Sequence, residues 1–131
     1  MKKVMFVCKK NSRRSQMAEG FARHLGEGKV SVTSSGLEAS YVDSLAVKAM
    51  SEVGIDISSQ TSLPLSDFNP EDYDAVISLC GCGVSLPPEW LTRDIFEDWE
   101  LDDPEGEGVE KFRQIRDRIK ERVIKLIDTL S

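Results

Sequence analysis

Cys8 is the residue of this sequence best placed to do chemistry, because it begins a short segment rich in hydrogen-bond donors. The segment reads C-K-K-N-S-R-R-S over residues 8–15, between an apolar run and a helical pattern. Such a loop directs backbone N–H groups inward at a helix N-terminus, where a tetrahedral anion is stabilised. A thiol in that setting ionises readily and can attack the anion. We therefore interpret Cys8 as the nucleophile of an oxyanion site.

Two further residues of the segment could assist Cys8. Arg14 carries a planar guanidinium that can hold two oxygens of a tetrahedral anion, and the Ser15 hydroxyl can donate to the Cys8 sulfur. The alternative is a small buried apolar cysteine beside a solvated basic surface. The strand before the loop, the helix after it and the downstream cysteines argue against that alternative.

Cys80 and Cys82 form the segment C-G-C and bring the number of cysteines to 3. An odd number without a secretory signal favours reactive thiols in a reducing compartment, so we expect a cytoplasmic protein. Half of a zinc site is another interpretation, but a second cysteine pair is missing and His24 is the single histidine. We expect His24 to be an ordinary helix residue and predict no metal.

Charge is distributed unevenly along the 131 residues, which we expect to form one domain over 1–131. The net charge is −6, yet residues 1–14 carry six Lys or Arg and no acid. An acidic chain is a poor partner for nucleic acid, whereas the local basic excess suits a small anion. The apolar runs are too short to cross a membrane. Lysines interrupt the first of them after 4–7, so a buried strand is a better interpretation than a signal peptide.

Hydrophobic patterning predicts four strands that alternate with helices. We expect strands over 3–7, 30–34, 74–79 and 93–99, and helices over 15–25, 44–53 and 109–130. Residues 55–70 should be irregular with a short turn near 65–68, and the glycines and prolines from 81 to 88 should form a loop. This alternation predicts an α/β fold with a parallel sheet and helices on both faces.

Ligands of such sheets bind beyond the carboxyl ends of the strands. The segments that follow the expected strands are the Cys8 loop, residues 34–36, residues 80–82 and residues 102–104. Every chemically suggestive group is therefore expected at one edge of the sheet.

V-C-K-K-N-S-R-R-S-Q-M-A-E-G-F at 7–21 resembles the phosphate-binding loop and first helix of the low-molecular-weight tyrosine phosphatases, and more specifically of the arsenate reductases built on that fold. The likeness extends through S-S-G-L-E at 34–38, A-M-S-E-V-G-I-D-I-S at 49–58, L-C at 79–80 and D-W-E-L-D-D-P at 98–104. It implies a four-stranded parallel sheet flanked by helices, and reduction of arsenate to arsenite.

The resemblance also implies roles for individual residues. Cys8 is the nucleophile, Arg14 clamps the oxyanion, Asn11 shapes the loop, and Asn11 and Ser15 tune the thiolate. Asp103 is the expected general acid in preference to Asp102, because Pro104 restricts its backbone. The expected substrate-binding residues are Lys9, Lys10, Asn11, Ser12, Arg13, Arg14 and Ser15.

Cys80 and Cys82 separate a reductase from a phosphatase. Attack of a thiol on a Cys8–arsenic adduct can release arsenite and leave a disulfide, which Cys82 can then take over from Cys8 by exchange with Cys80. If these thiols are idle, the chain is a phosphatase that hydrolyses phosphomonoesters through a Cys8 thiophosphate. A catalytically silent oxyanion-binding domain is the third class.

Three departures from the thioredoxin-linked relatives concern the reductant. Arg13 stands where they usually carry a cysteine, Lys10 where they carry a glycine, and only Gly81 separates the later cysteines. Lys9, Lys10 and Arg13 would attract the carboxylates of glutathione, so we expect reduced glutathione with glutaredoxin as donor and thioredoxin as second choice. We expect no tightly bound cofactor.

Some relatives bind potassium beside this loop. Asn11, Glu19 and Ser34 match that site, but Leu63 stands where an acid would be expected. We therefore predict no potassium site.

Overall fold

Four parallel strands form the sheet of the computed structural model, which describes residues 1–80 and 86–130. The strands are β1 (Lys2–Cys8), β2 (Val30–Gly36), β3 (Ala75–Ser78) and β4 (Ile95–Asp98), in the spatial order β2-β1-β3-β4. Each neighbouring pair is parallel, as right-handed crossover units require. The predicted α/β fold with a four-stranded parallel sheet is confirmed.

The strand register places the chemistry-bearing segments at one edge. Cys8 at the end of β1 pairs with Gly36 of β2, and Val7 pairs with Ser78 of β3. The pairing continues one residue further, because the Leu79 amide donates to the Val7 carbonyl at 2.9 Å. The loop after β1 and the segment after β3 therefore start side by side.

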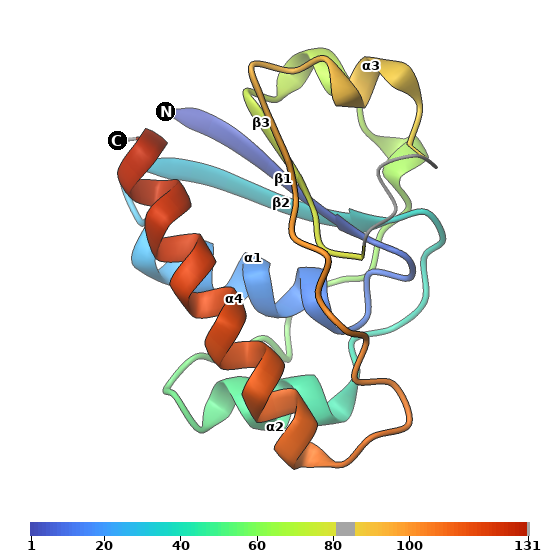
Figure 1. Ribbon diagram of the computed structural model, residues 1–131, viewed down its shortest axis with the longest axis vertical. Helices are drawn as coiled ribbons and strands as arrows, with labels where there is room; N and C mark the ends of the chain where they lie inside the picture. Colours follow the sequence, from blue (N-terminus) through green and yellow to red (C-terminus); the bar gives the residue numbers. More distant parts are fainter. Residues whose placement is uncertain (81–85, 131) are drawn as a thin grey trace.

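Alternate residues of β1 point to opposite faces, so its buried apolar run serves two cores. Val4 and Phe6 belong to the larger core, and Met5 and Val7 belong to the smaller one. Helices α1 (Arg14–Leu25), α2 (Ser44–Ser51) and α4 (Val109–Leu130) cover the larger core, whereas α3 (Pro88–Leu91) lies over the other face (Figure 1).

Helix α3 was not predicted; it begins at Pro88, the last residue of the loop expected over 81–88, and continues to Leu91. Pro88 opens this short helix and Trp90 is buried in the smaller core. Proline is compatible with a first helical turn, so a run of prolines does not exclude a helix that begins on one.

The other boundaries differ by a few residues. Helix α2 ends at Ser51 rather than at 53, and β4 is shorter than the predicted 93–99. Irregular chain over 55–70 is confirmed, with 3₁₀ turns at Leu65–Asp67 and Pro70–Asp72.

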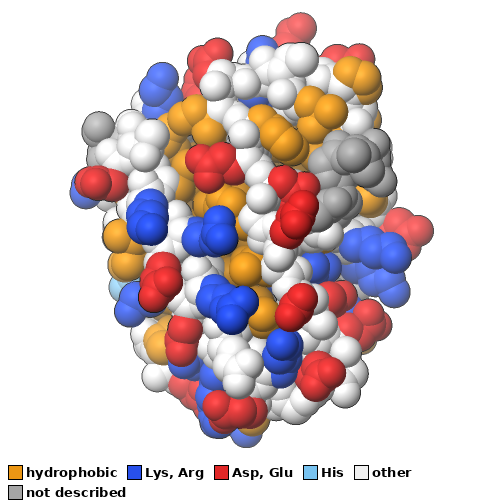
Figure 2. Space-filling view, viewed as in Figure 1, with side chains coloured by type: hydrophobic (Ala, Val, Ile, Leu, Met, Phe, Trp, Pro, Cys, Tyr) orange, Lys and Arg blue, Asp and Glu red, His pale blue; other side chains and the backbone are white. Residues whose placement is uncertain are grey.

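The outer surface over α4 mixes charges of both signs. Figure 2 shows Lys and Arg side chains interspersed with Asp and Glu on this face, so it offers no continuous basic surface. In the part of the chain that the structure describes, no helix is both long and apolar enough to cross a membrane.

Candidate active site

Cys8 ends β1 and lies at the base of the loop that leads into α1. Its side chain is only 2% exposed, and it is a free cysteine. The loop continues to Arg13, and α1 begins at Arg14 without a side-chain cap. The first N–H groups of α1 are consequently left for another acceptor, as at anion-binding helix N-termini.

The loop backbone turns sharply at Asn11, whose φ of 50° lies in the left-handed region. Asparagine tolerates that region better than most residues. Gly36 lies against this turn, since a Cβ at that position would come within 2.6 Å of the Asn11 nitrogen. Within residues 1–80 and 86–130, no acceptor binds the backbone amides of residues 9–13. The loop thus presents a set of unsatisfied donors around Cys8.

The Asn11 side chain fixes the direction of the hydrogen bonds that reach Cys8. Its Oδ1 accepts from the Leu63 amide at 2.8 Å, so its Nδ2 must be the donor to Ser15 Oγ, 2.8 Å away. Ser15 Oγ in turn lies 2.9 Å from Cys8 Sγ. Because the Ser15 oxygen accepts from Asn11, its hydrogen is free to point at a Cys8 thiolate.

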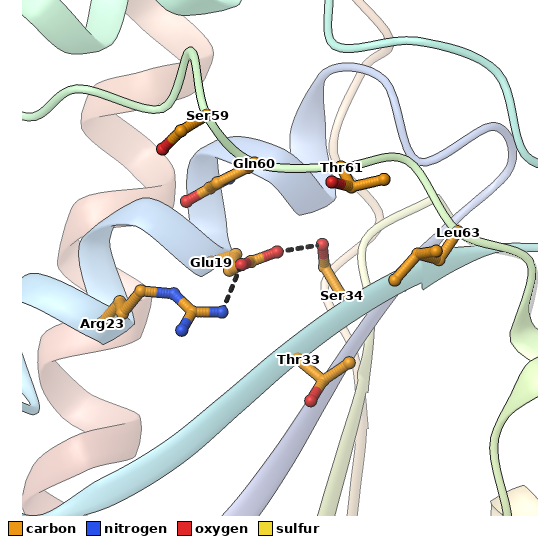
Figure 3. A pocket seen from close by; sticks show the side chains of 8 residues that line it. All are labelled: Glu19, Arg23, Thr33, Ser34, Ser59, Gln60, Thr61 and Leu63. Atoms are coloured by element: carbon orange, nitrogen blue, oxygen red, sulfur yellow. Dashed lines mark hydrogen bonds and ion pairs between the residues drawn. The ribbon is translucent and has the colours of Figure 1, made fainter.

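The same amide group also anchors α1 to β2. Asn11 Nδ2 donates to Ser34 Oγ at 2.9 Å, and Ser34 Oγ donates to Glu19 at 2.5 Å. Glu19 is buried in α1 and forms an ion pair with Arg23 one turn further along the helix. Figure 3 shows the Glu19 carboxylate between Arg23 and Ser34. These three residues line a cavity of about 360 Å³. Residues Asn11, Glu19 and Ser34 thus support the loop from behind.

Arg14 links the loop to the segments that follow β3 and β4. Its Nη1 donates to the Leu101 carbonyl at 2.8 Å and to the Leu79 carbonyl at 3.4 Å. Its Nε is buried and has no partner among the described residues. A buried guanidinium N–H without an acceptor is costly, so an anion bound in the loop would satisfy it.

The Arg13 guanidinium contacts three carboxylates, and the residue also lines the small hollow beside Cys8. It lies 6% exposed, with Nη1 3.1 Å from Asp43 Oδ2 and Nε 3.0 Å from Asp103 Oδ1. Its Nη2 is 3.4 Å from Glu105. Burial lowers the pKa of Arg13, but these carboxylates outweigh burial and raise it above its ordinary value. Arg13 therefore remains a cation, and its charge is already matched by acids.

Of the two neighbouring acids, only Asp103 reaches the loop. Asp103 contacts Arg14 at 3.5 Å as well as Arg13, and it lines a small hollow together with Cys8 and Lys10. Asp102 is turned outward, 74% exposed, beside Lys111. Ser12 also lines the hollow, whereas the Lys9 side chain is exposed.

A family model for low molecular weight phosphotyrosine protein phosphatase matches residues 3–131. The chain belongs to this family. In this member of the family, Cys8 and Arg14 of the segment between β1 and α1 line one hollow with Asp103, which lies between β4 and α4.

Arsenate reductases are among the relatives of this phosphatase-family chain. A Synechocystis sp. protein called glutaredoxin arsenate reductase is 65% identical over 100% of both chains. A solved structure described as an arsenate reductase in the phosphate binding state has 65% identity and a TM-score of 0.95 over 100% of both chains. Another, described as an arsenate reductase in oxidized state, has 65% identity and a TM-score of 0.96 over the same coverage.

Cys80 lies just beyond β3, at the same edge as the phosphatase-family loop. It is disulfide-bonded in the structure, and Ser78 Oγ lies 3.7 Å from its Sγ. Cys82, the third predicted redox residue, lies outside the described residues.

Sequence reasoning missed the carboxylate partners of Arg13 and the pairing of Glu19 with Arg23. The spacing of Glu19 and Arg23, four residues apart on a helix, was the available signal for that pair. Among residues 1–80 and 86–130, no group of three or more His, Cys, Asp or Glu is arranged to hold a metal ion.

Proposed function

We propose that this chain reduces arsenate to arsenite, using Cys8 as nucleophile and the C-G-C segment as its internal source of electrons. The Synechocystis protein and the solved structure that match this chain over its whole length are both called arsenate reductases, which supports this reaction. The solved structure is described as the phosphate binding state. The observation that favours a reductase over a phosphatase is the position of Cys80. It follows the strand that pairs with β1, which carries Cys8, and it is already disulfide-bonded.

The first step is nucleophilic attack on arsenic. The free amides of residues 9–13 and the Arg14 guanidinium hold the arsenate oxygens while the Cys8 thiolate forms a sulfur–arsenic bond. One arsenate oxygen departs, and Asp103 supplies the proton with which it leaves as water. Arsenic is still pentavalent in this adduct.

The second step transfers two electrons. The Cys80 thiolate attacks Cys8 Sγ, the sulfur–arsenic bond breaks, and its electron pair stays on arsenic, which leaves as trivalent arsenite. Cys8 and Cys80 are then joined in a disulfide. Attack of Cys82 on Cys80 releases the Cys8 thiolate and leaves a disulfide between Cys80 and Cys82. Support for this last pairing comes from the free state of Cys8 and the bonded state of Cys80.

External thiols complete the cycle. Two glutathione thiols, relayed by glutaredoxin, reduce the disulfide and end as glutathione disulfide, with thioredoxin as the second candidate. The name of the Synechocystis relative supports glutaredoxin. Lys9 and Lys10 offer ammonium groups that form no ion pair with a carboxylate among the described residues, and these suit the acidic glutathione. A cycle of free thiols needs a reducing compartment, so we propose the cytoplasm.

Hydrolysis of phosphomonoesters is the second candidate function. Cys8, Arg14 and Asp103 suffice for it, because water can hydrolyse a thiophosphate without any change in oxidation state. Membership of the phosphatase family favours this alternative.

Cys82→Ser distinguishes the two functions. Arsenite release by wild-type protein is measured with glutathione and glutaredoxin, and separately with reduced thioredoxin. We expect Cys82→Ser to stop after one equivalent of arsenite and to accumulate a Cys8–Cys80 disulfide, detected by peptide mass spectrometry. Sustained turnover by this variant would contradict the relay. Phosphomonoester hydrolysis that is insensitive to Cys82→Ser, without arsenite release by the wild type, would establish the phosphatase.

A further inference from the structure

Arg13 joins three segments that are far apart in the sequence. Its guanidinium contacts Asp43 before α2, and Asp103 and Glu105 in the segment between β4 and α4. With 6% of the residue exposed, this arginine is almost fully covered. A rigid guanidinium can hold several carboxylates at once in fixed directions, which a lysine cannot do.

Asp43, the first of the three carboxylates that Arg13 contacts, is itself held in place by the backbone. Its Oδ1 caps α2 by accepting from the Leu45 amide at 2.8 Å, while its Oδ2 receives Arg13. The Asp43 backbone amide also donates to the Ser12 carbonyl at 3.0 Å. Asp43 is thus held both by α2 and by the oxyanion loop, and it fixes the Arg13 guanidinium from there.

The two oxygens of Asp103 have different surroundings. Oδ1 accepts from Arg13 Nε at 3.0 Å and from the Glu105 amide at 3.1 Å. Oδ2 is 3.5 Å from Arg14 Nη2, the guanidinium that lines the same hollow as Cys8. Oδ1 therefore already accepts two hydrogen bonds, and Oδ2 is the oxygen of Asp103 that faces the loop.

We infer that Arg13 is a positioning residue that holds Asp103 with Oδ2 toward the departing oxygen, and that it is not a ligand of the oxyanion. This role rests on the proposed function, in which Asp103 delivers a proton. It places the proton of the acid on Oδ2, since Oδ1 already accepts two hydrogen bonds. It also explains why a basic residue of the loop has its charge matched by three acids.

The test is a double-mutant cycle in the full chain, in which rates are measured for wild type, Arg13→Gln, Asp103→Asn and the double variant. General acids contribute about 10²–10⁴-fold to rates, so we expect misplacing this one to lower the rate of arsenate adduct formation about tenfold. The KM for arsenate and the Kd for inorganic phosphate should change less than about threefold. In the Asp103→Asn background Arg13→Gln should have no further effect, because the acid it positions is absent.

Two further variants keep this test interpretable if Arg13→Gln folds poorly. Arg13→Lys keeps the charge but loses the fork, and we expect an intermediate rate. Arg113→Gln is the matched control, because Arg113 of α4 also bridges two carboxylates, Glu52 after α2 and Glu110 of α4, and it does not line the hollow beside Cys8. We expect its rate to equal that of the wild type.

A raised KM with an unchanged rate for Arg13→Gln would overturn the inference and make Arg13 a substrate ligand. An equal loss in the Asp103→Asn background would also overturn it. If the wild type releases no arsenite, the proposed function fails instead. The same cycle is then measured on phenyl phosphate, whose poor leaving group also needs a proton, with the same expected outcome.

Discussion

Among the residues that the structure describes, Ser15 is the one whose hydroxyl contacts the Cys8 sulfur. Its oxygen accepts from Asn11, and its hydrogen is left for Cys8 Sγ at 2.9 Å. Hydrogen bonds to charged groups contribute about 1.5–3 kcal/mol. We expect Ser15→Ala to lower the rate of Cys8 alkylation by iodoacetamide at pH 7 at least about tenfold.

Ser35→Ala is the matched control for this experiment. Ser35 is equally buried near the end of β2, but its hydroxyl contacts Met5 Sδ at 3.2 Å rather than Cys8. We expect it to leave the alkylation rate unchanged. An equal loss of rate in both variants would mean that buried hydroxyls act through general packing, and not through the bond to sulfur.

Residue spacing predicts local contacts better than distant ones. Cys8, Arg14 and Ser15 lie within eight positions, so the strand, loop and helix pattern was enough to place them together. The direction of the Arg13 side chain depends on Asp43 and Asp103, which are 30 and 90 positions away. No local pattern encodes such partners.

At the scale of elements, Glu52 links α2 to α4. It follows α2 directly and binds Arg113 at 2.7 Å and Arg116 at 3.0 Å, both from α4. Hydrogen bonding to Arg113, assisted by Arg116, lowers the pKa of Glu52 from 4.5 to about 2. A lowered pKa stabilises the fold above pH 4.5, and that stabilisation is lost as the pH falls through about 2.

We expect Glu52→Gln to lower the Tm at pH 7, and the difference from wild type to close between pH 4.5 and about 2. Thermal unfolding followed by circular dichroism across this range measures the difference. Because these groups are exposed, added salt should reduce it. Glu110→Gln removes a carboxylate that, among the described residues, pairs with Arg113 alone, and we expect it to have the smaller effect. A difference in Tm between Glu52→Gln and wild type that is constant with pH would exclude the ion pairs as its cause.

Element prediction succeeded where the hydrophobic period was long and failed where a short element began on proline. The period of three and four residues placed α4 over Val109–Leu130, because a long amphipathic helix repeats its pattern many times. Helix α3 spans only Pro88–Leu91, too few residues to show a period. Its burial depends on the Trp90 contacts in the smaller core, which are tertiary.

At the scale of the molecule, we propose that residues 1–131 unfold as one unit whose stability depends on anion binding. Only the folded chain brings the unpartnered Arg14 Nε and the free loop amides together in one place, so an anion that they bind stabilises the folded state. A ligand of the native state at 100 times its Kd adds about 2.7 kcal/mol. We expect inorganic phosphate to raise the Tm by several degrees in one cooperative transition.

Arg14→Lys tests the source of that stabilisation. The ammonium group keeps the charge but cannot place an Nε hydrogen in the loop, so the rise in Tm with phosphate should shrink by more than half. Chloride at the same ionic strength controls for screening. A phosphate effect of the same size in the variant and in the wild type would place the anion elsewhere.

The parallel pairing of β1 with β3 has a consequence for how such molecules diversify. The oxyanion loop is built on β1 and α1, and Cys80 stands on the neighbouring strand's extension. Backbone hydrogen bonds join the two strands without regard to side-chain identity. If the segment after β3 supplies electrons, as we propose, its cysteine spacing can therefore change without a change in the loop between β1 and α1. One scaffold can in this way exchange its redox partner, or lose redox chemistry, through changes confined to a single loop.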